Sequence, residues 1–148
     1  MICAIIHDTE VVRMSVARPN RGKSDAEFIV TAVKLEKETR SRCTHGPKRY
    51  TFYGLQELWQ TSRKICDLVT LANAFPPTTK AEAKKRRDRL HGARELIRVY
   101  NGQLGSLLDG DVLTPTAGGE LAELIRKEDV LLKGVMDSDR KRYANLPD

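Results

Sequence analysis

The chain has 148 residues and a net charge of +6, with 40% hydrophobic and 5% aromatic residues. This length fits one domain with a modest core, and the few aromatic residues argue against a β-sandwich. No apolar run approaches the roughly 20 residues that span a bilayer. The apolar start lacks the basic beginning and the cleavage site of a signal peptide. We therefore expect a cytoplasmic protein that does not enter a membrane.

Two patterns that resemble ligand sites fail on spacing. The three cysteines, Cys3, Cys43 and Cys66, are too few and too widely spaced for a disulfide framework or a zinc site. The Gly-Lys-Ser at residues 22–24 would need a glycine five positions earlier to form a phosphate-binding loop, and that position holds Ala17. The sequence therefore predicts neither a metal nor a cofactor.

Residues 1–23 have no hydrophobic period, and we interpret them as a flexible basic tail. The tail contains a proline and ends with three basic side chains, Arg18, Arg21 and Lys23. Met14 is an alternative start, which would make the residues before it an upstream extension.

The first helix is predicted to begin at Ser24, because Ser24-Asp-Ala-Glu27 has the form of a capping box. Apolar residues then recur at three- and four-residue spacing from Phe28 to Cys43, which is typical of an amphipathic helix. The His-Gly-Pro at residues 45–47 is expected to end it.

The second helix is predicted over residues 50–74, where a three-and-four spacing is sustained from Phe52 to Asn73. The Phe-Pro-Pro at residues 75–77 is expected to stop it. A residue before proline avoids helical geometry, and proline has no backbone N–H to donate.

Two longer helices complete the pattern. The third opens at Thr79-Lys-Ala-Glu82 with a second capping box and runs to Leu108. The fourth has Thr114 as its cap and a proline in its first turn, and it frays near Tyr143. These helices predict an all-α, antiparallel up-down four-helix bundle over residues 24–143, followed by a tail at 144–148.

The third helix carries an ordered basic stripe. Residues 80–98 hold eight basic and three acidic side chains, a net +5. On a helical wheel six of the basic or titratable groups fall within about 80° of one another, centred about 120° from the apolar face. This basic ridge consists of Lys80, Lys84, Arg87, His91, Arg94 and Arg98.

Like charges three and four residues apart repel by roughly 0.2–0.5 kcal/mol per pair, so a partner that offsets the repulsion is expected. Phosphates are the natural candidate, because each neutralised phosphate releases counterions. The alternative is a solvated helix face whose Lys and Arg stems cover apolar surface.

Three charged residues fall on or near the apolar faces of the predicted helices. Arg86 falls in the middle of the apolar face of the third helix, and we expect it to snorkel outward; the alternative is a pair with Glu57 or Glu128. Glu36 and Glu128 are expected at the boundary of the core rather than as general bases. No nucleophile–base pair can be named, so the sequence predicts no enzyme.

The helix layout and several segments resemble a bacterial and phage four-helix-bundle family. The segments are "HGPKRYTFY" after the first helix, "ANAFPPT" after the second, "RRDRLHGARELI" in the third and "ELAELIRKEDVLLKGVMDSD" in the fourth. The family includes the accessory variability proteins (Avd) of diversity-generating retroelements and the proteins encoded in ribosomal RNA intervening sequences. The resemblance covers roughly residues 24–143 and contains no catalytic motif.

The resemblance implies a ring-like homopentamer with a basic surface. It also implies a non-enzymatic accessory that binds a reverse transcriptase and its template RNA and helps that enzyme to make mutagenic cDNA. The basic ridge would contact RNA or DNA, with Lys48, Arg49 and the tail residues Arg18, Arg21 and Lys23 as secondary contacts. The net −3 of residues 99–148 departs from a uniformly basic surface.

Other functions remain open from the sequence. The ridge could meet an acidic protein, as in a structural or protein-interaction module of the ribosomal RNA intervening-sequence type. The chain could also be a DNA-binding protein of a mobile element. An enzyme is the least favoured, because the residues show no catalytic arrangement.

Overall fold

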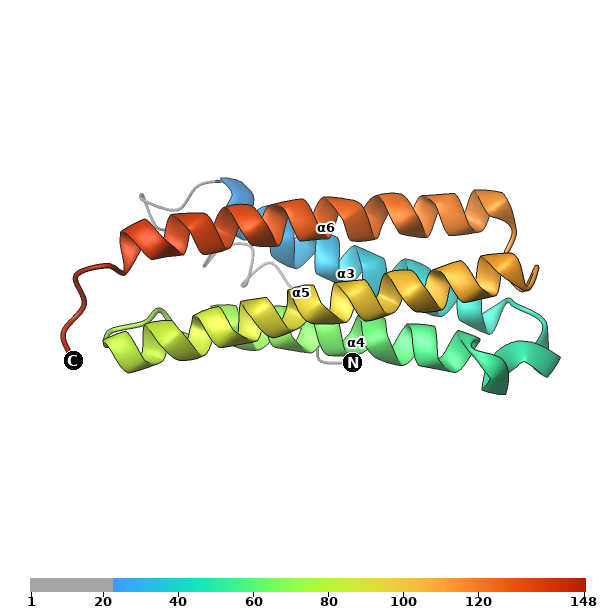
Figure 1. Ribbon diagram of the computed structural model, residues 1–148, viewed down its shortest axis with the longest axis horizontal. Helices are drawn as coiled ribbons and strands as arrows, with labels where there is room; N and C mark the ends of the chain where they lie inside the picture. Colours follow the sequence, from blue (N-terminus) through green and yellow to red (C-terminus); the bar gives the residue numbers. More distant parts are fainter. Residues whose placement is uncertain (1–22) are drawn as a thin grey trace.

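A computed structural model describes residues 23–148, with side chains over 27–50 and 54–148. The described residues form four α-helices and a short 3-10 helix, with no strand among them (Figure 1). The all-helical fold predicted from the sequence, with four helices consistent with a bundle, is confirmed. In chain order the elements are α3 (Lys23–Thr44), η1 (Lys48–Tyr53), α4 (Leu55–Asn73), α5 (Lys80–Asp109) and α6 (Pro115–Arg142).

Residues 1–22 of the tail predicted over 1–23 lie outside the described residues, and so do Arg18 and Arg21, whereas Lys23 is helical. The helix predicted from Ser24 begins one residue earlier, at Lys23, and no side chain is described for either residue.

Each long helix packs against two others. α4 contacts α3 and α5, and α6 contacts α3 and α5, so the four apolar stripes enclose one core. Residues of α5 meet residues of α6 in opposite order, because Arg86 pairs with Asp139 whereas Arg94 pairs with Asp129. The start of α5 therefore lies beside the end of α6.

The core matches the predicted stripes closely. In α5 the buried residues are Leu90, Ala93, Ile97, Tyr100, Leu104 and Leu107, together with Arg86. The Tyr100 hydroxyl lies 2.8 Å from Thr39 Oγ1, and the Thr39 hydroxyl donates to the Leu35 carbonyl at 2.7 Å. Because the one proton of Thr39 is used in this way, Tyr100 donates to Thr39, and the buried hydroxyls of α3 and α5 satisfy each other.

Two predicted helix starts are confirmed by their caps. The Thr79 side chain accepts from the Glu82 backbone N–H at 3.2 Å, and Thr114 does the same for Ala117. The Glu82 carboxylate reaches one residue further back than a capping box requires. It accepts from the N–H and the hydroxyl of Thr78, and these bonds lower the pKa of Glu82.

The predicted second helix is wrong at its start. Residues 48–53 form the 3-10 helix η1, and α4 begins only at Leu55. The break occurs at Gly54, whose φ of 144° is rarely adopted by residues with a side chain. A Cβ at this position would also lie 2.8 Å from Leu107 Cδ2 of α5. A helical wheel shows neither the φ angle of Gly54 nor its distance from Leu107.

No helix among the described residues has the length and apolar content needed to cross a bilayer.

Two adjacent glycines in α6 offer a test of the α5–α6 contact. A Cβ at Gly118 would lie 2.3 Å from Leu108 Cδ2, whereas a Cβ at Gly119 would meet nothing within 4 Å. We expect Gly119→Ala to stabilise the fold by up to about 1 kcal/mol through helix propensity. Gly118→Ala should destabilise it, because overpacking typically costs about 1–3 kcal/mol. Urea unfolding of both variants checks this, and equal stabilisation by both would contradict the packing.

Candidate functional site

The basic ridge of α5 is mostly exposed. Lys80, Lys84, Arg87, His91 and Arg98 are exposed, and Arg94 is half-buried. The ridge runs beside α6, since its first three cations share a pocket with residues of α6 and Arg94 bonds to that helix.

Several ridge residues already have acidic partners. Within α5, Lys84 Nζ lies 3.1 Å from Asp88 and His91 Nε2 lies 3.3 Å from Glu95. Lys80 Nζ lies 2.9 Å from the Asp148 carboxylate. These pairs are exposed, and such pairs are worth at most about 1 kcal/mol, so a polyanion can displace them.

Arg94 is held more firmly than the rest of the ridge. Its Nε lies 2.8 Å from Asp129 Oδ1 of α6, and this hydrogen bond raises the pKa of Arg94. Arg94 is therefore better placed to join α5 to α6 than to contact a ligand. By contrast, Arg87 and Arg98 have no ion-pair partner among the described residues.

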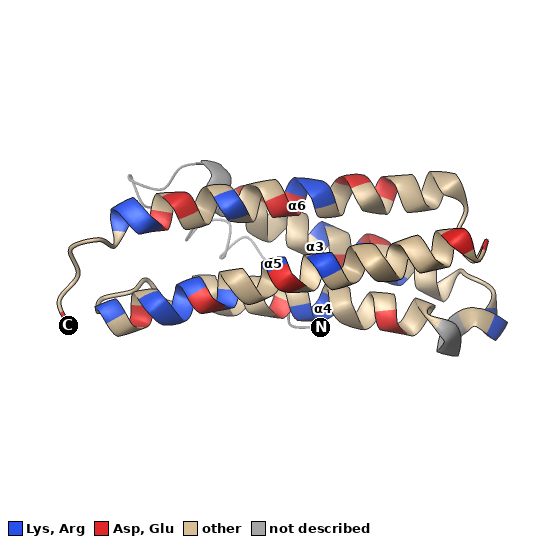
Figure 2. Cartoon of the chain, in the orientation of Figure 1, with Lys and Arg blue, Asp and Glu red and all other residues tan. Residues whose placement is uncertain are grey.

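The last turn of α6 adds cations that the sequence-based prediction missed. Arg140, Lys141 and Arg142 end this helix beside the start of α5. Figure 2 shows Lys and Arg segments gathering on both helices at the end of the bundle near the C-terminus. Three consecutive basic residues were a visible signal, but they lie in a stretch whose net charge is −3.

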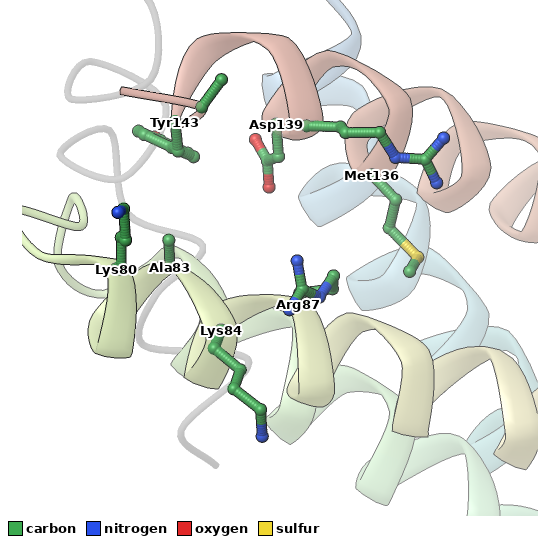
Figure 3. Close-up of a pocket in the computed structure, with 9 residues that line it drawn as sticks. Lys80, Ala83, Lys84, Arg87, Met136, Asp139 and Tyr143 are labelled. Carbon is green, nitrogen blue, oxygen red and sulfur yellow. The ribbon is translucent and has the colours of Figure 1, made fainter. Parts of the chain in front are cut away.

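A pocket lies between these two helix ends (Figure 3). It has a volume of about 380 Å³. Its lining combines cationic side chains with an apolar floor, and consists of Lys80, Ala83, Lys84, Arg87, Met136, Asp139, Arg140, Tyr143 and Ala144.

The expectation that Arg86 snorkels outward is wrong. Arg86 is only 5% exposed, and its Nε lies 2.6 Å from Asp139 Oδ2. Its Nη1 donates to the Ala72 carbonyl at 2.8 Å, near the end of α4. Arg86 therefore forms a buried ion pair with Asp139, and not with Glu57 or Glu128, the two alternatives that the sequence offered.

Arg89 has a related structural contact. Its Nη1 donates to the Leu71 carbonyl at 3.2 Å, so Arg86 and Arg89 together bind carbonyls in the last turn of α4. Cations at a helix C-terminus are favourable, because the unpaired carbonyls there carry partial negative charge. Two of the arginines in the basic run therefore act within the fold.

The secondary contacts do not join the ridge. Lys48 and Arg49 begin η1, which lies at the opposite end of the bundle from the start of α5 (Figure 1). The Arg49 guanidinium lies 4.7 Å from the centre of the Tyr50 ring. The predicted residues therefore do not form a single site.

Two apolar side chains are exposed near the end of α4. Phe75 is 84% exposed in the α4–α5 connection, and Leu71 is about half exposed. Neither lines the pocket between α5 and α6. In the sequence, Phe75 indicates only the end of the second predicted helix.

The two glutamates expected at the core boundary are both buried. Glu36 accepts from Trp59 Nε1 at 3.1 Å and lies 3.7 Å from Arg40. Glu128 is fully buried, and neither of its carboxyl oxygens has a hydrogen-bond partner among the residues that the structure describes. Burial raises the pKa of Glu128 well above its usual range, and the neighbouring Asp129 carboxylate raises it further.

A metal cluster and an activated thiol are the two remaining kinds of reactive group to consider among the described residues. They contain no group of three or more His, Cys, Asp and Glu residues that could hold a metal ion. The buried Cys43 thiol donates to the Leu55 carbonyl at 3.0 Å, and burial raises its pKa to about 11. Because the thiolate is the reactive form, Cys43 is a poor nucleophile at neutral pH.

Comparison of the chain with protein-family models, with curated proteins and with solved structures finds no match.

The Arg86–Asp139 pair can be tested for its contribution to stability. We expect Arg86→Met to cost about 3–5 kcal/mol, because it leaves a carboxylate buried without its partner. The double variant R86M/D139L should recover part of that loss, since an apolar pair removes both buried charges. Urea unfolding measures both effects, with Arg126→Met in the exposed Arg126–Glu123 pair as the control. A double variant less stable than R86M would contradict the expected coupling.

Glu128 should make stability depend on pH. An unfolded glutamate titrates near about 4.3. The folded protein holds this proton to higher pH, so the free energy of unfolding should fall as pH rises from about 4.3 through the raised pKa of Glu128. Glu128→Gln removes the ionisation and should flatten the decline between pH 4.5 and 7.5. Chemical unfolding across that range, with the exposed Glu57→Gln as control, tests this. Parallel curves for wild type and E128Q would contradict it.

Proposed function

We propose that this chain is a non-enzymatic nucleic-acid-binding accessory protein. It would partner a reverse transcriptase and its template RNA in the mutagenic cDNA synthesis of a diversity-generating retroelement. The family resemblance of the sequence suggests this role. The observation that carries the proposal is the gathering of cations from α5 and α6 at one end of the bundle.

The cations that support RNA binding come from two helices. Lys80, Lys84, Lys85 and Arg87 lie in the first turns of α5, and Arg140 lies near the end of α6. All five are exposed. A concentration of positive charge on one surface attracts polyanions and speeds their association.

The proposed assembly is an antiparallel up-down bundle that forms a ring-like homopentamer in the cytoplasm. A ring would present the basic end of each subunit several times. Several weak phosphate contacts on one particle bind an RNA strand more tightly than one subunit can, because each later contact is intramolecular.

Charge reversal at the basic end tests the proposal. If four phosphates are neutralised, binding of a single-stranded RNA should weaken roughly 50-fold between 50 and 200 mM salt. The double variant R87E/R140E should bind RNA of any sequence more weakly than wild type does, and its affinity should fall less steeply with salt. Fluorescence anisotropy with labelled RNA measures both effects.

The matched control is K64E/K133E, which makes the same change in net charge at exposed residues outside the pocket. Equal weakening by both double variants would show that net charge alone matters. A monomer by light scattering that retains no RNA at low salt would overturn the proposal. Capture of an acidic partner protein that survives nuclease treatment, with no affinity for nucleic acid, would favour a protein-interaction module.

A further inference from the structure

The pocket between α5 and α6 differs from the rest of the basic surface because it is concave. Its volume of about 380 Å³ falls within the range of small-molecule sites, which begin near 300 Å³. A basic ridge on a helix can lie along a phosphate backbone. Only a concave site can enclose a group that projects from that backbone.

The lining has two chemical sides. Ala83, Met136 and Ala144 supply an apolar surface, and Arg87 supplies a cation with no ion-pair partner among the described residues. In Figure 3 the Arg87 side chain points from α5 into the space between the helices, where Met136 also points. Lys84 lines the pocket, but its side chain runs away from α6. Its ammonium group therefore lies outside the pocket, where it contacts Asp88.

The one acidic group in the lining does not make the pocket negative. Asp139 is 9% exposed, and Arg86 neutralises it through contacts at 2.6 and 3.4 Å. Lys80 has Asp148 as an exposed partner, which an incoming anion can displace. Arg87 and Arg140 therefore give the lining a net positive charge beside its apolar residues.

We propose that this pocket binds one unpaired nucleotide, with its phosphate at Arg87 and Arg140 and its base against Ala83 and Met136. The inference rests on the proposed function and narrows it to single-stranded nucleic acid. A base within a duplex is stacked on both faces and paired at its edge, so it cannot enter a pocket without leaving the helix. An unpaired base has a free face that can pack on apolar side chains.

The ligand expected for this pocket is a nucleoside monophosphate, either free in solution or as one nucleotide of a strand. A substitution that fills the pocket without changing its charge distinguishes binding in the pocket from general electrostatic binding to the basic surface. Ala83→Phe places a large ring in the pocket. Ala81→Phe is the matched control, because Ala81 lies on the same helix, is exposed and does not line the pocket.

The experiment compares three probes by anisotropy or titration: a single-stranded RNA of about 12 nucleotides, its duplex, and uridine monophosphate. Wild type and A81F should prefer the single strand, and A83F should bind it at least about tenfold more weakly. Binding of the duplex should be the same in all three proteins. Binding of the mononucleotide, followed by the Met136 methyl signal in NMR, should be lost only in A83F.

The outcomes distinguish the two proposals. Equal single-strand binding by A83F and A81F overturns the pocket inference, while the effect of R87E/R140E still tests the proposed function. Equal weakening of single strand and duplex by A83F also overturns it, because the pocket would not select unpaired nucleotides. A Met136 shift with the mononucleotide that only A83F loses supports a nucleotide pocket even if no RNA strand binds. If wild type binds the RNA strand but not the mononucleotide, and A83F loses strand binding, the pocket recognises a nucleotide only as part of a strand.

Discussion

The ion pair between Arg86 and Asp139 connects three helices at the end of the bundle where the positive charge gathers. Arg86 extends from α5 to the carboxylate of α6, and it also donates to the Ala72 carbonyl near the end of α4. A buried guanidinium needs all of these acceptors, because an unpaired buried charge is very costly. The pair therefore determines how closely the end of α6 approaches the start of α5. It also neutralises Asp139, the acidic residue that lines the pocket.

Acidic and basic residues are interspersed along α6, and its last turn holds three consecutive cations. Acidic side chains at two points along α6 meet cations on neighbouring helices, as Glu120 does with Arg42 of α3 and Asp129 with Arg94 of α5. The cations at the end of α6 lie beside the first turns of α5 instead. The net negative charge of the last third of the chain is compatible with a basic end of the bundle, because the first turns of α5 add their own cations there and Arg86 pairs with Asp139.

The helical wheel predicted part of the candidate site and missed the rest for identifiable reasons. It identified Lys80, Lys84 and Arg87 as neighbours on one exposed face, since that relation depends only on the helical period. It had no means of finding that Asp129 binds Arg94 or that Arg140 completes the pocket. Those contacts join residues 35 or more positions apart, so they depend on which helices are neighbours.

The sequence by itself determined where α5 and α6 begin, which residues form the apolar stripes and that the fold is helical. Caps such as Thr79 and Thr114 act on backbone groups three residues away, and helical periodicity is equally local. Only the tertiary structure decided that Gly54 separates η1 from α4, that Arg86 is buried and that two distant basic runs share a pocket. Each of these outcomes depends on a neighbouring helix, which supplies the contact with Leu107, the carboxylate of Asp139 or the second wall of the pocket.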